Sequence, residues 1–377
     1  MLNEAMKNYI RDSYEETLQL IRDLCAIPAP SNHEEQRAEF CKEWFRKNGF
    51  THVTIDSAWN VIAPVGLNND SEPVTVVMAH TDTVFPDMVP MPCTEDTECM
   101  YSPGIVDDTA NLAVMMICSR YFKDHYPADK GAYLFIANSG EEGLGDLKGT
   151  KKIMEVYGSR VKEFITLDSA NFNTIHCDAV GSHRYNVTIR TEGGHSFYKF
   201  GNNNAIATLA AMINLLYTVK VPQEGNSHTT YNVGMISGGT SVNTIAQEAQ
   251  MLYEYRSDNR NCLAKMQNLF EKTVETFRAT GVEVRIEKVG DRPCASPVDP
   301  ERFRTLKCRA NTALKEILDM EYTEKSASTD CNIPLSMGIP AICFGVVKGT
   351  GAHTREEKLY KEGLKTGSAI LLNFLYQ

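Results

Sequence analysis

The sequence has 377 residues, which at roughly 100 to 200 residues per domain predicts more than one domain. Its composition, 42% hydrophobic and 23% charged, is that of an ordinary globular protein and excludes disordered, collagen-like and coiled-coil classes. The net charge of −10 disfavours nucleic acid or an anionic membrane as a partner, because both require clustered positive charge.

The cellular location is predicted from the first residues and from the cysteines. The first twenty residues mix charged and apolar side chains and lack the apolar segment of a signal peptide, and no run reaches the ~18 apolar residues of a membrane span. The eleven cysteines include no C-x-x-C pair, so neither a disulfide framework nor a thiolate zinc site is expected. We therefore expect a cytoplasmic protein with reduced thiols and no membrane partner.

Two helices are predicted before the first strand. Apolar residues recur every three or four positions from Met6 to Cys25, which predicts one continuous helix. Ser31, followed three residues later by Glu34, predicts a capping box at the start of a second helix.

Four short apolar runs predict buried strands of a mostly parallel sheet, at residues 74–79, 132–137, 164–167 and 341–347. Each run is followed by side chains that bind metals, namely His80 with Asp82, Glu141 with Glu142, Asp168, and His353. Ligands of open α/β sheets bind at the carboxyl ends of the strands, so we expect these side chains to form one site.

The segment between these runs has a different pattern. From Gly181 to Gly290 the order of predicted elements is β-α-β-β-α-β, which is typical of a self-contained ferredoxin-like module. A proline-rich linker, residues 291–300, follows it. We therefore expect an α/β catalytic domain made of residues 1–180 and 297–377, with helices flanking its sheet, and an inserted domain made of residues 181–296.

The candidate ligands form a nitrogen and oxygen set without thiolates: His80, Asp107, Glu142, Asp168 and His353. Such a set suits zinc or another first-row divalent ion, and five ligands can hold two ions if one carboxylate bridges them. Each residue taken singly also has an ordinary interpretation, as a surface turn, a helix N-cap or a strand end. Of two adjacent glutamates, one can coordinate a metal while the other accepts a proton from water.

Six segments, taken together and in this order, resemble a known family: AHTDT, GIVDDTANLAVMM, SGEEGLGDLKG, LDSA, GGHSFYKFGNNNAI and GTGAHTREE. They are similar to the co-catalytic metallopeptidases that include peptidase T, acetylornithine deacetylase, succinyl-diaminopimelate desuccinylase and aminoacylase. The form SGEEGLG most resembles peptidase T and its relatives. The resemblance implies a zinc exopeptidase-like catalytic domain, with an inserted lid through which the chain forms a homodimer.

The resemblance also implies how the ligands are shared. His80, Asp107 and Asp168 would hold one ion, and Glu142, Asp107 and His353 the other, so that Asp107 bridges. The two ions would be zinc, with cobalt or manganese as alternatives.

Further roles follow from the same resemblance. Asp82 would orient His80, Glu141 would be the general base, and the peptide bond between Asp107 and Asp108 would be cis. The helix start differs from the family pattern, because this chain has Asp107-Asp108-Thr109-Ala110-Asn111 where many relatives have DDKGG.

In the inserted domain, three residues match functional positions of the family. His195 would stabilise the oxyanion in the partner subunit's site, and Asn243 and Arg256 would contact the substrate. An arginine fork suits a substrate carboxylate. The ordinary interpretations are a loop histidine, a turn former and an exposed strand residue.

The function expected from all of this is hydrolysis of short peptides by a di-metal exopeptidase, an aminopeptidase of the peptidase T type acting on di- and tripeptides. One alternative is an N-acyl-amino-acid deacylase or carboxypeptidase with the same water-activating groups. Another is an inactive metal-binding scaffold, which Glu141 disfavours because no structural site requires it.

Overall fold

The computed structural model describes residues 2–377 and divides into two compact units. One unit takes the chain up to Ala179 and again from Ser296 onward, and the other is Val180–Ala295. Each boundary lies one residue before the predicted one. The first unit is called the discontinuous unit below, and the second the inserted unit.

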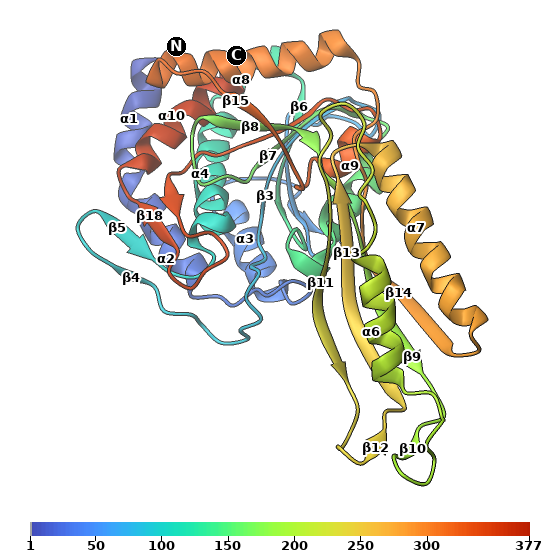
Figure 1. Ribbon diagram of the computed structural model, residues 1–377. Coiled ribbons are helices and arrows are strands. Elements are labelled where there is room, and N and C mark those ends of the chain that lie inside the picture. The colour runs from blue at the N-terminus through green and yellow to red at the C-terminus, as the bar shows by residue number, and fades with distance from the viewer. Residues whose placement is uncertain (1) are drawn as a thin grey trace. The chain divides into compact units, whose positions relative to one another are not determined.

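Within residues 2–377 the discontinuous unit contains one eight-stranded mixed sheet (Figure 1). In spatial order its strands are β1 (Thr54–Ile55), β2 (Val61–Val65), β6 (Ala132–Asn138), β3 (Val74–His80), β7 (Val161–Leu167), β16 (Ala341–Phe344), β8 (Thr174–Ala179) and β15 (Thr323–Ala327). The four central neighbours β6, β3, β7 and β16 are parallel, which confirms the four strands predicted from the apolar runs.

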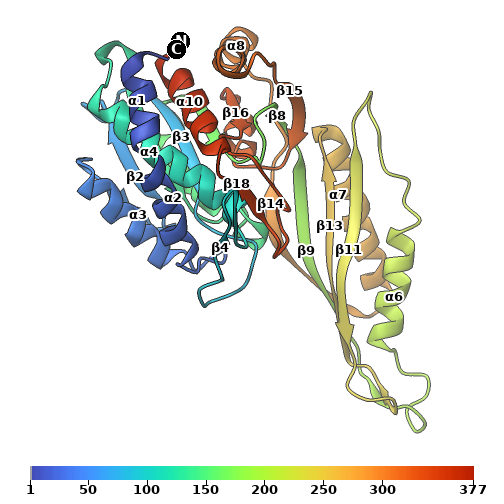
Figure 2. The ribbon, with the colours of Figure 1, turned by 90° about the vertical axis from the view of Figure 1, so that its left-hand side faces the viewer.

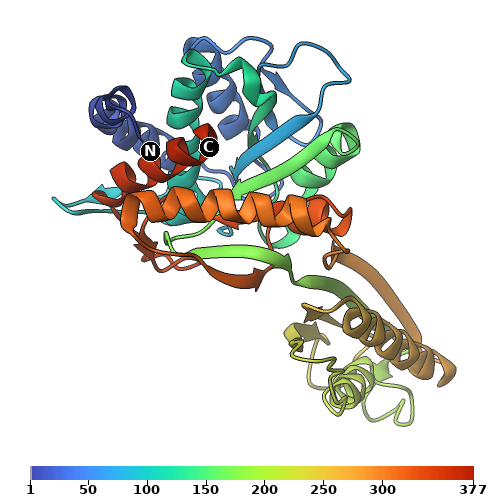
Figure 3. The same ribbon diagram turned by 90° about the horizontal axis from the view of Figure 1, so that it is seen from above.

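Helices cover both faces of this sheet, so every residue of β3 and β6 is buried. The α-helices are α1 (Glu4–Asp12), α2 (Tyr14–Cys25), α3 (Glu35–Lys47), α4 (Ala110–Asp124), α5 (Lys148–Tyr157), α8 (Pro300–Leu318), α9 (Asn332–Ser336) and α10 (Gly363–Tyr376). Val77 and Ala79 of β3 belong to the same apolar core as α4, whereas Met78 contacts Thr150 of α5 on the other face. Figure 3 shows α8 running across the unit beside α10. None of the described helices is long and apolar enough to cross a membrane.

Shorter elements complete this unit. A small antiparallel sheet joins β17 (Gly349–Thr350), β18 (Lys358–Tyr360), β5 (Cys99–Tyr101) and β4 (Thr94–Glu95). Single turns lie at η1 (Ile105–Thr109), η2 (Ala128–Lys130) and η3 (Gly143–Gly145).

Two details of the N-terminal segment differ from prediction. The single helix expected from Met6 to Cys25 is divided at Ser13, whose hydroxyl donates a hydrogen bond to the Tyr9 carbonyl. The predicted capping box is wrong, because α3 begins at Glu35 without a side-chain cap. The Ser31 hydroxyl instead donates to the Asp82 carboxylate, at 2.6 Å.

The inserted unit has the predicted β-α-β-β-α-β order. Its elements are β9 (Gly181–Arg190), α6 (Ala205–Leu216), β11 (Thr229–Gly238), β13 (Glu248–Ser257), α7 (Arg260–Ala279) and β14 (Glu283–Arg292), with β10 (Gly194–His195) and β12 (Thr244–Ile245) pairing separately. The sheet is antiparallel with spatial order β11-β13-β9-β14, and both helices cover one face of it (Figure 2). Alternate residues such as Tyr185, Tyr253 and Tyr255 form the core against Phe270 of α7.

Candidate metal centre

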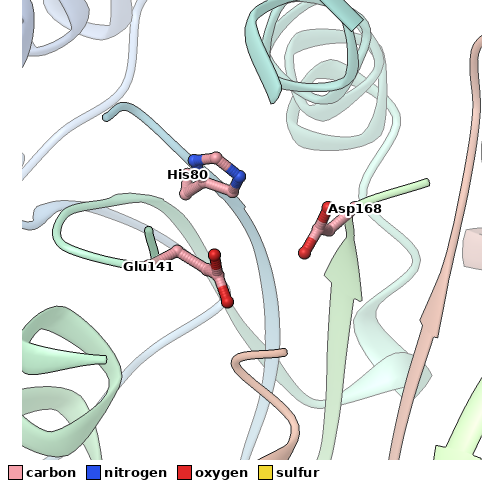
Figure 4. Close-up of side chains that lie close together, drawn as sticks. All are labelled: His80, Glu141 and Asp168. Atoms are coloured by element: carbon pink, nitrogen blue, oxygen red, sulfur yellow. The ribbon is translucent and has the colours of Figure 1, made fainter. Parts of the chain in front are cut away.

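The candidate ligands and the candidate general base Glu141 gather at the carboxyl ends of the parallel strands. His80 is the last residue of β3, Asp168 follows β7, and Glu141 and Glu142 lie in the turn after β6. Ligand atoms of His80, Glu141 and Asp168 lie within 4.8 Å of one another, and Figure 4 shows these side chains around a common space. A second group, His80, Asp107 and Glu142, meets the same criterion. The predicted convergence of distant segments is therefore present.

Asp107 lies between the two histidines. Its Oδ1 is 3.0 Å from His80 Nε2, and its Oδ2 is 3.1 Å from His353 Nε2. The peptide bond between Asp107 and Asp108 is cis, as the resemblance implied. At the two distances given above, each oxygen of the Asp107 carboxylate faces a different imidazole, which is the arrangement that a bridging ligand needs.

Glu142 completes the side of the site that carries His353. Its Oε1 lies 3.1 Å from His353 Nε2 but, among the described residues, it accepts no hydrogen bond although it is buried. A buried carboxylate oxygen without a donor is costly unless a cation compensates it. The donor set, two imidazoles and several carboxylates without a thiolate, therefore fits a pair of first-row divalent ions.

The charges of the site also favour the binding of cations. Burial and the charge of Asp107 raise the pKa of Asp168 to about 7. Burial also opposes ionisation of Asp107, but its contacts with His353 and His80 hold its pKa below the usual range. The nearby carboxylates of Asp107 and Glu142, each 3.1 Å from its Nε2, raise the pKa of His353 to about 11. These carboxylates therefore attract positive charge strongly, and protons and metal ions compete for the same atoms.

Asp82 contacts both His80 and the turn that carries the glutamates. His80 Nδ1 lies 3.0 Å from the Asp82 backbone carbonyl and 3.5 Å from its carboxylate, so an N–H at Nδ1 leaves Nε2 free to coordinate. The Asp82 carboxylate accepts hydrogen bonds from the N–H groups of Glu141, at 2.9 Å, and Glu142, at 3.0 Å. Burial opposes its ionisation, but the hydrogen bonds from His80, Ser31 and Glu141 lower the pKa of Asp82 to about 2.

Two residues that support the site, Glu357 and Ser31, were not predicted in that role from the sequence. The buried Glu357 carboxylate accepts the backbone N–H of His353, at 3.2 Å, and that of Val106, at 3.1 Å. It therefore joins the loop of His353 to the segment of Asp107. Ser31, taken for a helix cap, supports Asp82. The segment HTREE places Glu357 four residues after His353, but the sequence alone does not predict the direction of the Glu357 side chain.

The three predicted residues of the inserted unit fall into two places. His195 is exposed in β10, and the N–H of its neighbour Ser196 donates to the Asn243 carbonyl, so these two predicted residues are close together. The strands β10 and β12, which pair with each other, lie at one end of the inserted unit's sheet (Figure 1). Arg256 lies in β13, where its guanidinium donates two hydrogen bonds, each of 3.0 Å, to Glu254.

Comparison with known proteins identifies the family. The model of peptidase family M20/M25/M40 matches residues 76–377, which is well over half of the chain. The chain therefore belongs to this family, and it is a metal-dependent hydrolase.

Proteins with several different activities are similar to this chain. A succinyl-diaminopimelate desuccinylase from Hydrogenovibrio crunogenus is 26% identical over 262 residues, covering 64% of this chain and 68% of that protein. The solved structure of the aminopeptidase PepT from Bacillus cereus is 22% identical, with a TM-score of 0.70 over 96% of this chain and 98% of the other. A tripeptidase structure from Staphylococcus aureus is 22% identical, with a TM-score of 0.74 over 96% and 97% of the two chains. At 22% identity, the similarity to these two structures shows the fold of this chain.

Proposed function

We propose that the protein is a dinuclear aminopeptidase that removes the N-terminal residue from di- and tripeptides. The observation that carries the proposal is the position of Asp107, whose two oxygens lie 3.0 Å and 3.1 Å from His80 and His353. A carboxylate placed in this way can be shared by two ions. The fold similarity to an aminopeptidase and to a tripeptidase supports the choice of substrate.

The proposed ligands divide into two sets that share Asp107. His80, Asp107 and Asp168 hold one ion, and Glu142, Asp107 and His353 hold the other. The nitrogen and oxygen donors favour zinc, and cobalt and manganese suit the same set.

The proposed reaction uses Glu141 as general base. When bound, a pair of divalent ions acidifies water and polarises the scissile carbonyl group. The Glu141 carboxylate accepts the proton of the attacking water and then delivers it to the leaving amine. The Asp82 carboxylate holds the N–H groups of Glu141 and Glu142, so it fixes the turn from which one glutamate coordinates and the other moves the proton.

We also propose that the chain works as a homodimer joined through the inserted unit. Its edge strand β11 exposes the apolar side chains of Met235 and Ile236, at 65% and 58% of their full surface. An apolar sheet edge is a pairing surface for a second chain. In the dimer His195 serves the partner's site as an oxyanion donor, with Asn243 beside it as a substrate contact.

Arg256 is proposed to bind the carboxylate at the C-terminus of the peptide. Its guanidinium already holds the Glu254 carboxylate through two parallel hydrogen bonds, and a substrate carboxylate needs this same geometry. We further propose a cytoplasmic location, which the eleven cysteines without a C-x-x-C pair support.

Deacylation of N-acyl amino acids is the second candidate. The similarity to a succinyl-diaminopimelate desuccinylase favours it, because that activity requires the same water-activating groups and differs in how the substrate's ends are held.

A hydrolysis screen separates the two candidates. Protein loaded with zinc, cobalt or manganese is given a tripeptide, the same tripeptide with an acetylated N-terminus, and an N-succinyl amino acid. The proposal predicts release of the N-terminal amino acid from the free tripeptide alone. Release of succinate or acetate with the tripeptide intact would identify a deacylase, and no product from any substrate would contradict both candidates.

A further inference from the structure

Asn111 is a buried amide whose hydrogen bonds converge on the ligand-bearing segments. It lies in the first turn of α4 and is completely buried. Its Nδ2 donates to Asp108 Oδ1, at 2.7 Å, and to the Ser169 carbonyl, at 3.2 Å. Its Oδ1 accepts the N–H of Val346, at 2.9 Å. Both amide donors and the carbonyl oxygen are thus engaged, which fixes the orientation of the side chain.

Each of these partners is linked to a proposed ligand. Asp108 and Ser169 directly follow Asp107 and Asp168 in the chain. Val346 lies just beyond β16, on the segment that continues to the loop of His353.

Asp108 extends the network to the fourth segment. Its Oδ2 accepts the N–H of His80, at 3.0 Å, while its Oδ1 accepts from Asn111. The pair Asp108 and Asn111, both completely buried, therefore joins the ends of β3, β7 and β16 to the start of α4 through side-chain hydrogen bonds.

We propose that Asn111 is a positioning residue, which sets the relative placement of the Asp107 and Asp168 carboxylates and thereby the affinity of the site for its ions. The inference rests on the proposed two-metal function. Glycine at position 111 could form none of these three side-chain bonds. Asn111 is not itself a proposed ligand, so the network acts on the metal site only through Asp108, Ser169 and Val346.

A purely structural role makes a different prediction. If Asn111 only stabilised the start of α4, its removal would lower the melting temperature without changing metal binding. Asn373 provides a matched control, because it is also buried in the discontinuous unit and its Nδ2 donates to Ala313 and Glu316, which are not ligands.

The test compares Asn111→Gly with Asn373→Ala in the full-length protein. Zinc affinity is measured by competition with a chromophoric chelator, ligand geometry by the visible absorption of the cobalt-loaded protein, and turnover by separate kcat and KM values. We expect Asn111→Gly to hold zinc about 10- to 100-fold more weakly, to shift the cobalt absorption bands and to lower kcat more than it raises KM. Asn373→Ala should change only the melting temperature.

A folded Asn111→Gly protein with wild-type zinc affinity and cobalt spectrum would overturn the inference. If this variant does not fold, the same criteria apply to Asn111→Ser, which retains a shorter donor and acceptor and should lie between wild type and the glycine variant. Wild-type protein that binds no metal would instead contradict the proposed function, so the two failures are distinguishable.

Discussion

Asp82 contacts two parts of the candidate metal site at once. The resemblance implied that it orients His80, and the imidazole does contact it, principally at the backbone carbonyl. Its carboxylate accepts both N–H groups of the glutamate turn and the hydroxyl of Ser31. The spacing of two residues could indicate the first contact, but only the folded chain reveals the second.

Glu141→Gln tests the assignment of the general base. The substitution keeps the shape of the side chain and removes its ability to accept a proton, so turnover should fall about 10²- to 10⁴-fold. Metal content should stay near the wild-type value, because Glu141 is not among the proposed ligands. Steady-state kinetics and elemental analysis of the same sample measure both quantities.

Glu155→Gln is the matched control for this substitution. Glu155 is an exposed residue of α5 that pairs with Lys152, so its replacement should leave turnover unchanged. Near-normal rates in Glu141→Gln would remove this residue from the mechanism.

Asp107→Ala tests the bridge. The shared carboxylate belongs to both proposed ligand sets, so its loss should deplete both ions, whereas Asp168→Ala should deplete one. Elemental analysis after gel filtration gives the number of ions that each variant retains. Two firmly held ions in Asp107→Ala would show that Asp107 does not bridge.

At the scale of elements, the predictable features were those set by local pattern. The apolar runs of β3, β6, β7 and β16 indicated a parallel sheet, and parallel strands bring their carboxyl ends to one edge. What remained unpredictable depends on tertiary contacts between distant loops. Ser31 matches a helix cap by spacing, yet its hydroxyl donates to Asp82, and the direction of the buried Glu357 carboxylate was not readable from the sequence.

Removal of metal should loosen the ligand-bearing turns of the discontinuous unit. Without a cation, the carboxylates gathered there repel one another, and local opening becomes easier. Hydrogen exchange with and without a chelator should show faster exchange in residues 105–111, 141–146 and 349–357, with no change in β9 and β13. Equal acceleration in both units would show that metal does not stabilise these turns specifically.

At the scale of the whole molecule, mixed dimers test whether His195 acts across subunits. His195→Ala and Glu141→Gln should each be nearly inactive, since removal of one oxyanion donor typically costs about 10²- to 10³-fold. In a dimer of the two variants, the His195→Ala chain keeps its own Glu141 and receives His195 from its partner. Refolding the variants together should restore activity that approaches about one quarter of wild type if chains pair at random and one oxyanion donor serves each site.

The control for this experiment is each variant refolded alone, which should stay inactive. Native mass spectrometry establishes how many mixed dimers have formed. Mixed dimers without recovered activity would place the action of His195 within its own chain or outside the mechanism.

The proposed function depends on two ions that share Asp107 at the strand ends of the discontinuous unit. The most direct measurement is a crystal structure of the zinc-loaded protein with anomalous diffraction recorded on both sides of the zinc absorption edge. We expect two anomalous peaks about 3.5 to 4 Å apart, with Asp107 between them, His80 and Asp168 beside one and Glu142 and His353 beside the other. A single peak, or two peaks that do not share Asp107, would contradict this proposal.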